Sequence, residues 1–109
     1  MIEVTKYLVR AVYTAEGVKG LSKKGGTARV DAIRSVAEKL GGKLESFYFA
    51  FGEYDTYVII DLPDNASAAS IGLAVSGSGA ARTDTVVLMT PAEVDEAVSK
   101  ELGYRAPGE

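Results

Sequence analysis

The sequence predicts an α+β fold of the ferredoxin-like type, with the element order β-α-β-β-α-β and an extra C-terminal helix. Three observations lead to this fold. Four segments are rich in β-branched and aromatic residues, as strands are. One segment between them repeats its apolar residues at helical spacing, and a second is rich in small residues behind a capping aspartate. Right-handed crossovers place both helices on one side of an antiparallel sheet, so we expect two layers.

The four strands are expected where such segments are bounded by turn residues. They are placed at Val4 to Tyr13, Lys43 to Phe51, Tyr54 to Leu62 and Arg82 to Met89. Gly52-Glu53 predicts a tight turn between the second and third strands. The glycines and lysines from Gly17 to Gly26 predict a flexible, solvated connection after the first strand.

Three helices are expected. The first runs from Thr27 to Leu40, before Gly41-Gly42, and the second from about Asn65 to Ser76, where Asp64 can act as the N-cap. The third begins at the capping box formed by Thr90 and Glu93, with a proline at the first helical position, and ends at Gly103.

Residues on both faces of the predicted sheet are apolar. In the first strand, Tyr7 and Val9 alternate with Leu8 and Val12, and the third and fourth strands alternate in the same way. Two helices can cover one face, whereas the terminal helix is too short to cover the other. Because a monomer would expose this second apolar face, we expect a homodimer or higher homo-oligomer with the sheets face to face.

The composition excludes several function classes. The net charge of −3 argues against nucleic acid or an anionic membrane as a partner. The chain has no cysteine, histidine or tryptophan, which excludes disulfides, Cys/His zinc sites, thiol nucleophiles and histidine triads. We therefore expect no cofactor and no metal site. We expect one domain over residues 1–103 with a tail at 104–109 and, since no leader or membrane span is recognisable, a cytoplasmic location.

Three segments carry a resemblance to a known family. They are Leu40 to Tyr48, Phe51 to Asp55 and Arg82 to Thr85. With them the chain resembles the GYD-domain family from its first strand through its fourth, and the most specific part is a Gly-Glu-Tyr-Asp turn after a Gly-Gly-Lys-Leu strand start. That family comprises small bacterial and archaeal proteins of largely undefined role. It is similar to the dimeric α/β-barrel superfamily, so the resemblance implies face-to-face sheets.

The turn between the second and third strands supplies the candidate catalytic residues Glu53, Tyr54 and Asp55. The two carboxylates could share protons or bind a polar ligand, with the tyrosine as a hydrogen-bond donor. The alternative is a structural turn in which Gly52 adopts a positive φ and Asp55 bonds to nearby backbone.

Four further residues are candidates for ligand binding. Arg29 and Arg82 carry planar guanidinium groups suited to a carboxylate ligand, or else form structural ion pairs with Glu53 or Asp55. Tyr48 and Tyr57 could line a cavity for a hydrophobic or aromatic molecule, which is the ligand type that the superfamily resemblance implies. Packing in the core or in a dimer is the alternative.

Two function classes follow. The first is a homo-oligomeric module that binds a small hydrophobic or aromatic ligand, with or without cofactor-independent oxidation, isomerisation or cyclisation chemistry. The second is a non-enzymatic structural or protein-interaction module. An enclosed cavity with convergent polar groups would favour the first class, and a filled core the second.

Overall fold

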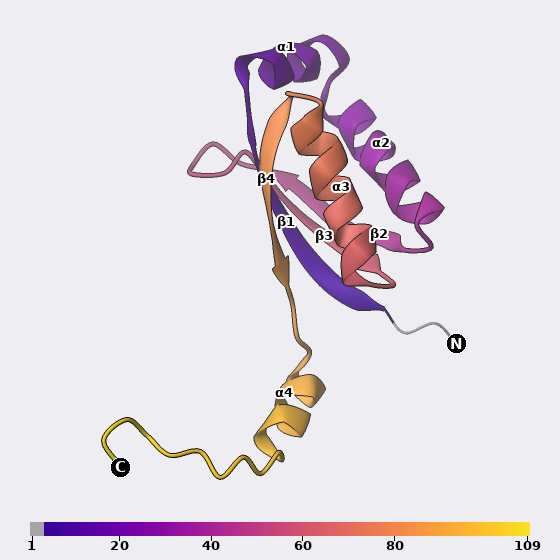
Figure 1. The fold of residues 1–109 in the computed structure, drawn as a ribbon. Coiled ribbons are helices and arrows are strands. Elements are labelled where there is room, and N and C mark those ends of the chain that lie inside the picture. Colours follow the sequence, from indigo (N-terminus) through magenta and orange to yellow (C-terminus); the bar gives the residue numbers. More distant parts are fainter. Residues whose placement is uncertain (1–3) are drawn as a thin grey trace.

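Figure 1 shows the computed structural model, which describes residues 4–109; residues 1–3 of the domain expected over 1–103 lie outside this range. The strands form one antiparallel sheet in the order β2-β3-β1-β4. They are β1 (Thr5–Tyr13), β2 (Lys43–Phe49), β3 (Thr56–Leu62) and β4 (Ala81–Val87). The helices are α1 (Ala15–Lys24), α2 (Gly26–Lys39), α3 (Asn65–Gly77) and α4 (Pro91–Val98). The predicted α+β class is confirmed, and the strand order is that of a ferredoxin-like fold.

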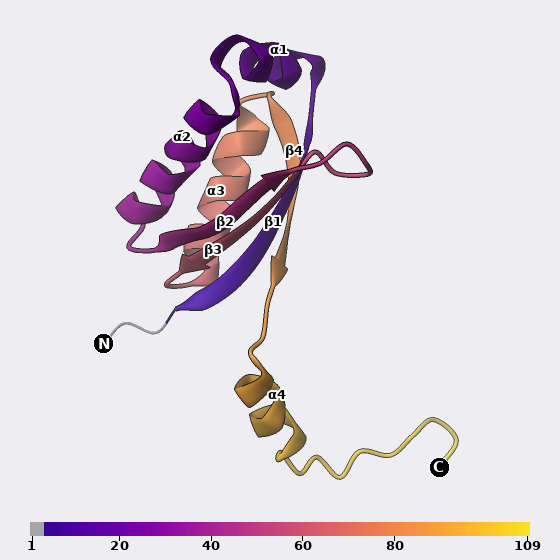
Figure 2. The same ribbon diagram turned by 180° about the vertical axis from the view of Figure 1, so that it is seen from behind.

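Helices α2 and α3 cover one face of the sheet, and the core lies between the two layers (Figures 1 and 2). The alternation read from the sequence is correct for β1, because Tyr7, Val9 and Ala11 are buried against the helices while their neighbours are not. From α2 and α3, Ile33 and Ile71 complete this layer. The largest fully buried side chains are Tyr7, Ile60 and Leu62.

The flexible connection predicted between Gly17 and Gly26 is wrong, because most of this segment is helix α1. The Thr14 hydroxyl caps the helix by accepting a hydrogen bond of 3.2 Å from the Gly17 amide. Gly17 carries no Cβ, which lets the helix approach the Ala80 carbonyl closely. Gly25, with φ of 86°, ends the helix, and α2 begins one residue later. Gly17 therefore allows close packing, and Gly25 ends the helix.

Several element boundaries also differ from the sequence prediction, and β4 ends at Val87 instead of Met89. Strand β2 ends earlier than expected, at Phe49, and β3 begins later, at Thr56, so a six-residue connection replaces the tight turn. Helix α4 ends at Val98 instead of Gly103, while its capping box at Thr90 is confirmed. Residues 99–105, which follow Val98, form no helix and are all exposed.

The second face of the sheet is not covered within residues 4–109 (Figure 2). Leu8 on β1 lies at its centre, paired in register with Ile59 on one side and Val86 on the other. Helix α4 leaves the far end of β4 and extends away from the sheet, so it does not cover this face (Figure 1). We call this uncovered surface the open face.

Candidate functional site

A polar cluster that the sequence analysis did not identify lies on the open face. It joins Arg10 on β1, Asp84 on β4 and Tyr54 in the β2–β3 connection. The Arg10 Nε and Nη2 atoms donate hydrogen bonds of 2.9 Å to the two carboxylate oxygens of Asp84. The Tyr54 hydroxyl donates a third, of 2.7 Å, and the Arg10 guanidinium lies 4.4 Å from the centroid of the Tyr54 ring. One carboxylate thus accepts three hydrogen bonds.

The electrostatics of this cluster fix its protonation states. Hydrogen bonds from Arg10 and then from Tyr54 hold the pKa of Asp84 below its ordinary value. The hydrogen bond to Asp84, with desolvation, raises the pKa of Tyr54. Tyr54 therefore keeps its proton at neutral pH and uses it on Asp84, so it is a hydrogen-bond donor and not a general base.

The other two candidate catalytic residues, Glu53 and Asp55, take different positions in the turn. Asp55 accepts a hydrogen bond of 2.8 Å from the Tyr13 amide, and its own amide donates to the Ala11 carbonyl at 2.8 Å. Both bonds attach the connection to β1, so Asp55 has a structural role, but its partners are the backbone of a distant strand and not of its own turn. The positive φ expected at Gly52 is not found. Glu53 is exposed at the tip of the connection. Within the Gly-Glu-Tyr-Asp segment, Asp55 thus supports the backbone of β1, whereas Tyr54 belongs to the Arg10–Asp84 cluster.

The four candidate ligand-binding residues do not form one site within a single chain. Tyr48 and Tyr57 are register partners on the open face, 70% and 38% exposed. Arg82 lies on the opposite edge strand, paired in register with Val12. Arg29 lies on α2, on the helical side of the sheet. Among the described residues neither arginine forms an ion pair, so the proposed pairs with Glu53 or Asp55 are not formed.

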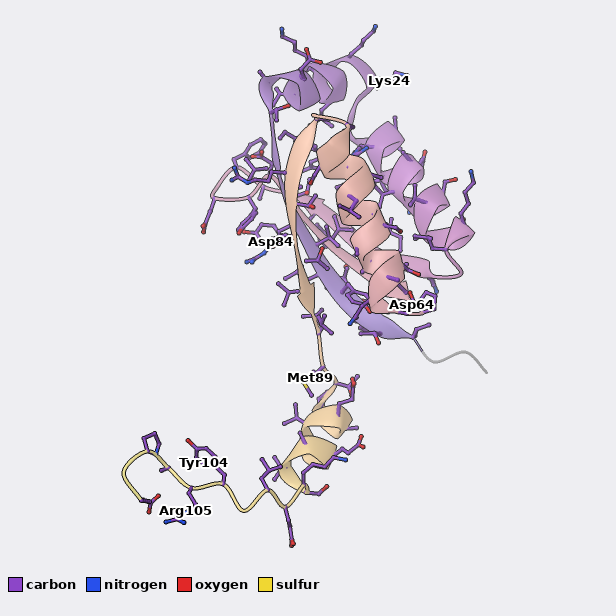
Figure 3. All side chains as sticks on the ribbon, viewed as in Figure 1. Lys24, Asp64, Asp84, Met89, Tyr104 and Arg105 are labelled. Atoms are coloured by element: carbon purple, nitrogen blue, oxygen red, sulfur yellow. The ribbon has the colours of Figure 1, made fainter. Side chains whose placement is uncertain are left out.

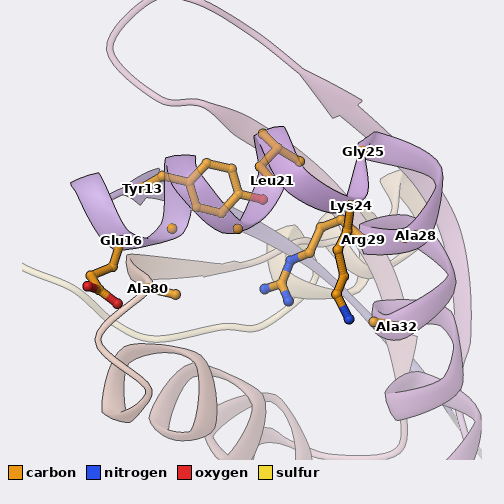
Figure 4. A pocket seen from close by; sticks show the side chains of 11 residues that line it. Tyr13, Glu16, Leu21, Lys24, Gly25, Ala28, Arg29, Ala32 and Ala80 are labelled. Atoms are coloured by element: carbon orange, nitrogen blue, oxygen red, sulfur yellow. The ribbon is translucent and has the colours of Figure 1, made fainter.

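Arg29 lines a cavity on the helical side, at the end of the sheet where α1 crosses (Figure 4). Its volume is about 250 Å³, and the walls come from α1, the first half of α2, the end of β1 and Ala80, the residue before β4. Most of the lining is small or apolar: Tyr13, Gly17, Gly20, Leu21, Ala28, Ala32 and Ala80. We call this the α1–α2 cavity. The helix that the sequence analysis missed therefore forms one of its walls.

Two cationic side chains come to this cavity from different helices. Figure 4 shows Arg29 from α2 and Lys24 from the last turn of α1 extending to the same side of it, with Glu16 at the other end. Arg29 also lines a smaller gap of about 30 Å³ between the sheet and the helices, next to the buried Thr56. The cavity thus combines an apolar body with a positive rim, an arrangement suited to an apolar molecule that carries an anionic group.

A third concave surface lies on the other side of α1. It has a volume of about 420 Å³ and is lined mainly by apolar side chains, with Asp55 at its edge. Val18 and Leu21 contribute from α1, Phe49 from the end of β2 and Phe51 from the β2–β3 connection. We call it the α1 groove. Phe51 is fully exposed, so this surface presents an aromatic ring to solvent.

Signals for the missed features were present in the sequence. Thr14 precedes a segment with apolar residues at Val18 and Leu21, an acidic first turn and lysines in the last turn, which is a helix signature that the glycines concealed. Arg10 and Asp84 both lie at outward positions of predicted strands. Their pairing depends on the β1–β4 register, which sequence alternation alone does not give.

Neither a metal cluster nor a membrane-spanning helix is found in the described part of the chain. Within residues 4–109 no cluster of three or more acidic side chains could hold a metal ion. No helix in that range is long and apolar enough to cross a membrane.

Comparison with known proteins gives one match. A family model described as the GYD domain matches residues 7–98, from the third residue of β1 to the end of α4. No match was found among curated proteins or among solved structures.

Proposed function

This chain belongs to the GYD domain family, and on that basis we propose that it is a homo-oligomeric module that binds a small apolar molecule carrying an anionic group. The observation that carries the proposal is the α1–α2 cavity, with Arg29 and Lys24 at its rim. Ligand pockets in proteins have volumes of about 300–1,000 Å³. The α1–α2 cavity, at about 250 Å³, lies below this range, so its ligand would be a small molecule of one or two rings.

The cationic rim supports a carboxylate as the anionic group. Arg29 is half-buried and forms no ion pair among the described residues, so its guanidinium donors are free for a ligand. A guanidinium matches a carboxylate with two parallel hydrogen bonds. Tyr13 and Leu21 would pack against the apolar part of the same molecule.

We propose binding without an assigned reaction, because the three candidate catalytic residues lie outside the cavity. Tyr54 retains its proton and donates it in a hydrogen bond to Asp84, and Asp55 accepts from the β1 backbone. Neither these two turn residues nor Glu53 lines the α1–α2 cavity. A ligand held there would therefore be out of reach of all three.

The homo-oligomeric part of the proposal rests on the open face. Leu8, Ile59 and Val86 form an apolar row across three strands, and the exposed rings of Tyr48 and Tyr57 continue the surface. A second copy placed sheet to sheet would bury this row, since a two-fold axis pairs the same surface with itself. Burial of apolar area is the driving force of such association.

Ligand binding can be tested with 2-naphthoate, and with neutral 2-naphthalenemethanol as the comparison. We expect 2-naphthoate to shift the amide NMR signals of Tyr13, Leu21 and Ala32. Ala32→Phe, which fills the cavity, should abolish these shifts. Arg29→Gln should weaken naphthoate binding by about tenfold and leave the neutral alcohol unaffected. Arg34→Gln is the control, because Arg34 lies on the same helix and pairs with Asp31 outside the cavity. Shifts confined to the open face, or none, would refute this site.

The oligomeric state can be tested separately by sedimentation. Ile59→Asp introduces a charge at the centre of the open face and should convert the dimer to a monomer. Leu73→Asp is the matched control, since Leu73 is 75% exposed on α3 and lies away from this face. A wild-type chain that sediments as a monomer at micromolar concentration would contradict the dimer.

A further inference from the structure

Helix α4 is well formed but has nothing to pack against in its own chain. Its capping box is complete, with the Thr90 hydroxyl accepting from the Glu93 amide at 3.1 Å and the Glu93 carboxylate accepting from the Thr90 amide at 2.9 Å. Yet every residue of the helix is exposed. We call residues 88–109, which follow β4 and include α4, the C-terminal arm. Figure 3 shows Met89, Tyr104 and Arg105 along this arm, away from the sheet and from α2 and α3.

The length of α4 makes a packing partner necessary. It has eight residues, and isolated helices shorter than about 12–15 residues are only marginally stable in water. Its apolar residues Val94 and Val98 are one helical turn apart and are 47% and 79% exposed. Leu102 and Tyr104 add two large apolar side chains, 80% and 76% exposed. A cap alone does not compensate for this exposure, so the surface is suited to docking.

We propose that α4 of one copy packs into the α1 groove of a second copy of this chain. The α1 groove, defined above by Val18, Leu21, Phe49 and Phe51, is the apolar surface that fits a short helix with two or three apolar anchors. Val94 and Val98 would contact it, and the ring of Phe51, which is fully exposed in one chain, would be covered.

Charge complementarity identifies α1 as the partner surface. Helix α4 contains three carboxylates and no cation: Glu93, Asp95 and Glu96. Helix α1 contains three lysines and one carboxylate: Lys19, Lys23, Lys24 and Glu16. Opposite charges around an apolar contact favour the correct pairing and disfavour others.

The direction of the arm requires that the contact be made between copies. Helix α1 crosses one end of the sheet and α4 extends beyond the other end, so they lie far apart in one chain (Figure 1). A two-fold axis perpendicular to β4 would invert the partner, and each arm would then reach the α1 end of the other copy. Such an exchange is reciprocal and forms a closed dimer. It rests on the second copy in the proposed function, but not on the ligand.

A disulfide between copies tests this contact directly, since the chain has no native cysteine. In the variant with Val18→Cys and Val98→Cys, mild oxidation should give a covalent dimer on a denaturing gel. Reduction should return this band to the position of the monomer. The control combines Val98→Cys with Leu73→Cys, which is similarly exposed but lies on α3, and should stay monomeric on the same gel. Equal cross-linking in both variants, or none in the first, would overturn the arm exchange.

Charge reversal gives a second measurement that leaves the fold intact. Lys19→Glu with Lys23→Glu should raise the dimer dissociation constant by about tenfold, and adding Asp95→Lys with Glu96→Lys should restore it. Arg34→Glu with Lys39→Glu, two exposed cations in the second half of α2, should have no effect. A dimer that Ile59→Asp disrupts, but that gives no cross-link in the variant with Val18→Cys and Val98→Cys, would refute the arm exchange and keep the sheet-to-sheet dimer. Absence of any dimer would refute both.

Discussion

Arg10 and Asp84 are register partners on β1 and β4, and their side chains form two parallel hydrogen bonds of 2.9 Å. This pair lies on the open face, beside the apolar row that we propose to be an interface. Tyr54 adds a hydrogen bond to the same carboxylate and covers the guanidinium with its ring. The pair therefore connects the Gly-Glu-Tyr-Asp segment to the edge strand β4.

Asp84→Asn should lower the free energy of unfolding, because Arg10 then loses its charged partner and Tyr54 its strongest acceptor. Tyr54→Phe should have a smaller effect, since the Arg10–Asp84 pair stays in place. Urea denaturation of Arg10→Gln, Asp84→Asn and the double variant gives a cycle in which the two effects should be clearly less than additive. Additive effects would show that the pair contributes nothing to stability.

The cluster should also make stability depend on pH in the acid range. The pKa of Asp84 is lower in the folded chain than in the unfolded chain, where it is about 3.9. Its contribution is therefore complete above about pH 4 and is lost as the pH falls through the lowered folded value. Asp84 is 44% exposed, so solvent reduces the effect. Between about pH 5 and pH 2, the urea midpoint of Asp84→Asn should fall less steeply than that of the wild type.

For Tyr54 the dependence of stability on pH has the opposite sign and falls in the alkaline range. Its pKa is raised by the hydrogen bond to Asp84, so the folded chain holds the phenolic proton more tightly than the unfolded chain does. This contribution is complete below about pH 10 and is lost as the pH rises through the raised value. In an ultraviolet titration, the number of tyrosines that ionise at a raised pH should be smaller by one in Tyr54→Phe than in the wild type. An unchanged late phase would place the raised pKa on another tyrosine.

Two glycines of α1 should respond oppositely to the same substitution. A Cβ on Gly17 would lie 1.9 Å from the Ala80 carbonyl oxygen, whereas a Cβ on Gly20 would meet nothing within 4 Å. Gly20→Ala should stabilise the helix by about 0.5–1 kcal/mol. Gly17→Ala should destabilise the protein by more than that amount, because the clash is with backbone. Thermal denaturation of the two variants measures both signs, and equal effects would contradict the close approach of α1.

The two faces of β3 can be compared by truncating adjacent residues. Ile60 is buried against the helices, and Ile60→Ala should cost about 2–5 kcal/mol of folding free energy. Ile59 is half-buried on the open face, so Ile59→Ala should act mainly on dimerisation. Urea midpoints measured over a range of protein concentrations separate these effects. If the midpoint of Ile59→Ala varies with protein concentration as strongly as that of a dimeric wild type, Ile59 lies outside the interface.

Much of this fold could be predicted because its signals are local. The apolar spacing around Ile33 and Ala37, the aspartate cap at Asp64 and the capping box at Thr90 depend only on neighbouring residues, and the structure contains all three. The alternation in β1 also depends on neighbours, since successive side chains of a strand point to opposite faces. Helix α1 was not predicted because glycine lowers helix propensity. Gly17 is needed for close packing against the Ala80 carbonyl, which is far away in the sequence.

The α+β class, the faces of the strands, the family and the absence of histidine and cysteine chemistry follow from the amino-acid sequence alone. Which polar residues meet depends on the three-dimensional arrangement of the elements. Arg10 and Asp84 are 74 positions apart and come together through one strand register. Arg29 joins Lys24 at a cavity because the single residue Gly25 separates α1 from α2 and turns the chain between them. Side-chain contacts between distant elements depend on register and packing, and no local pattern encodes them.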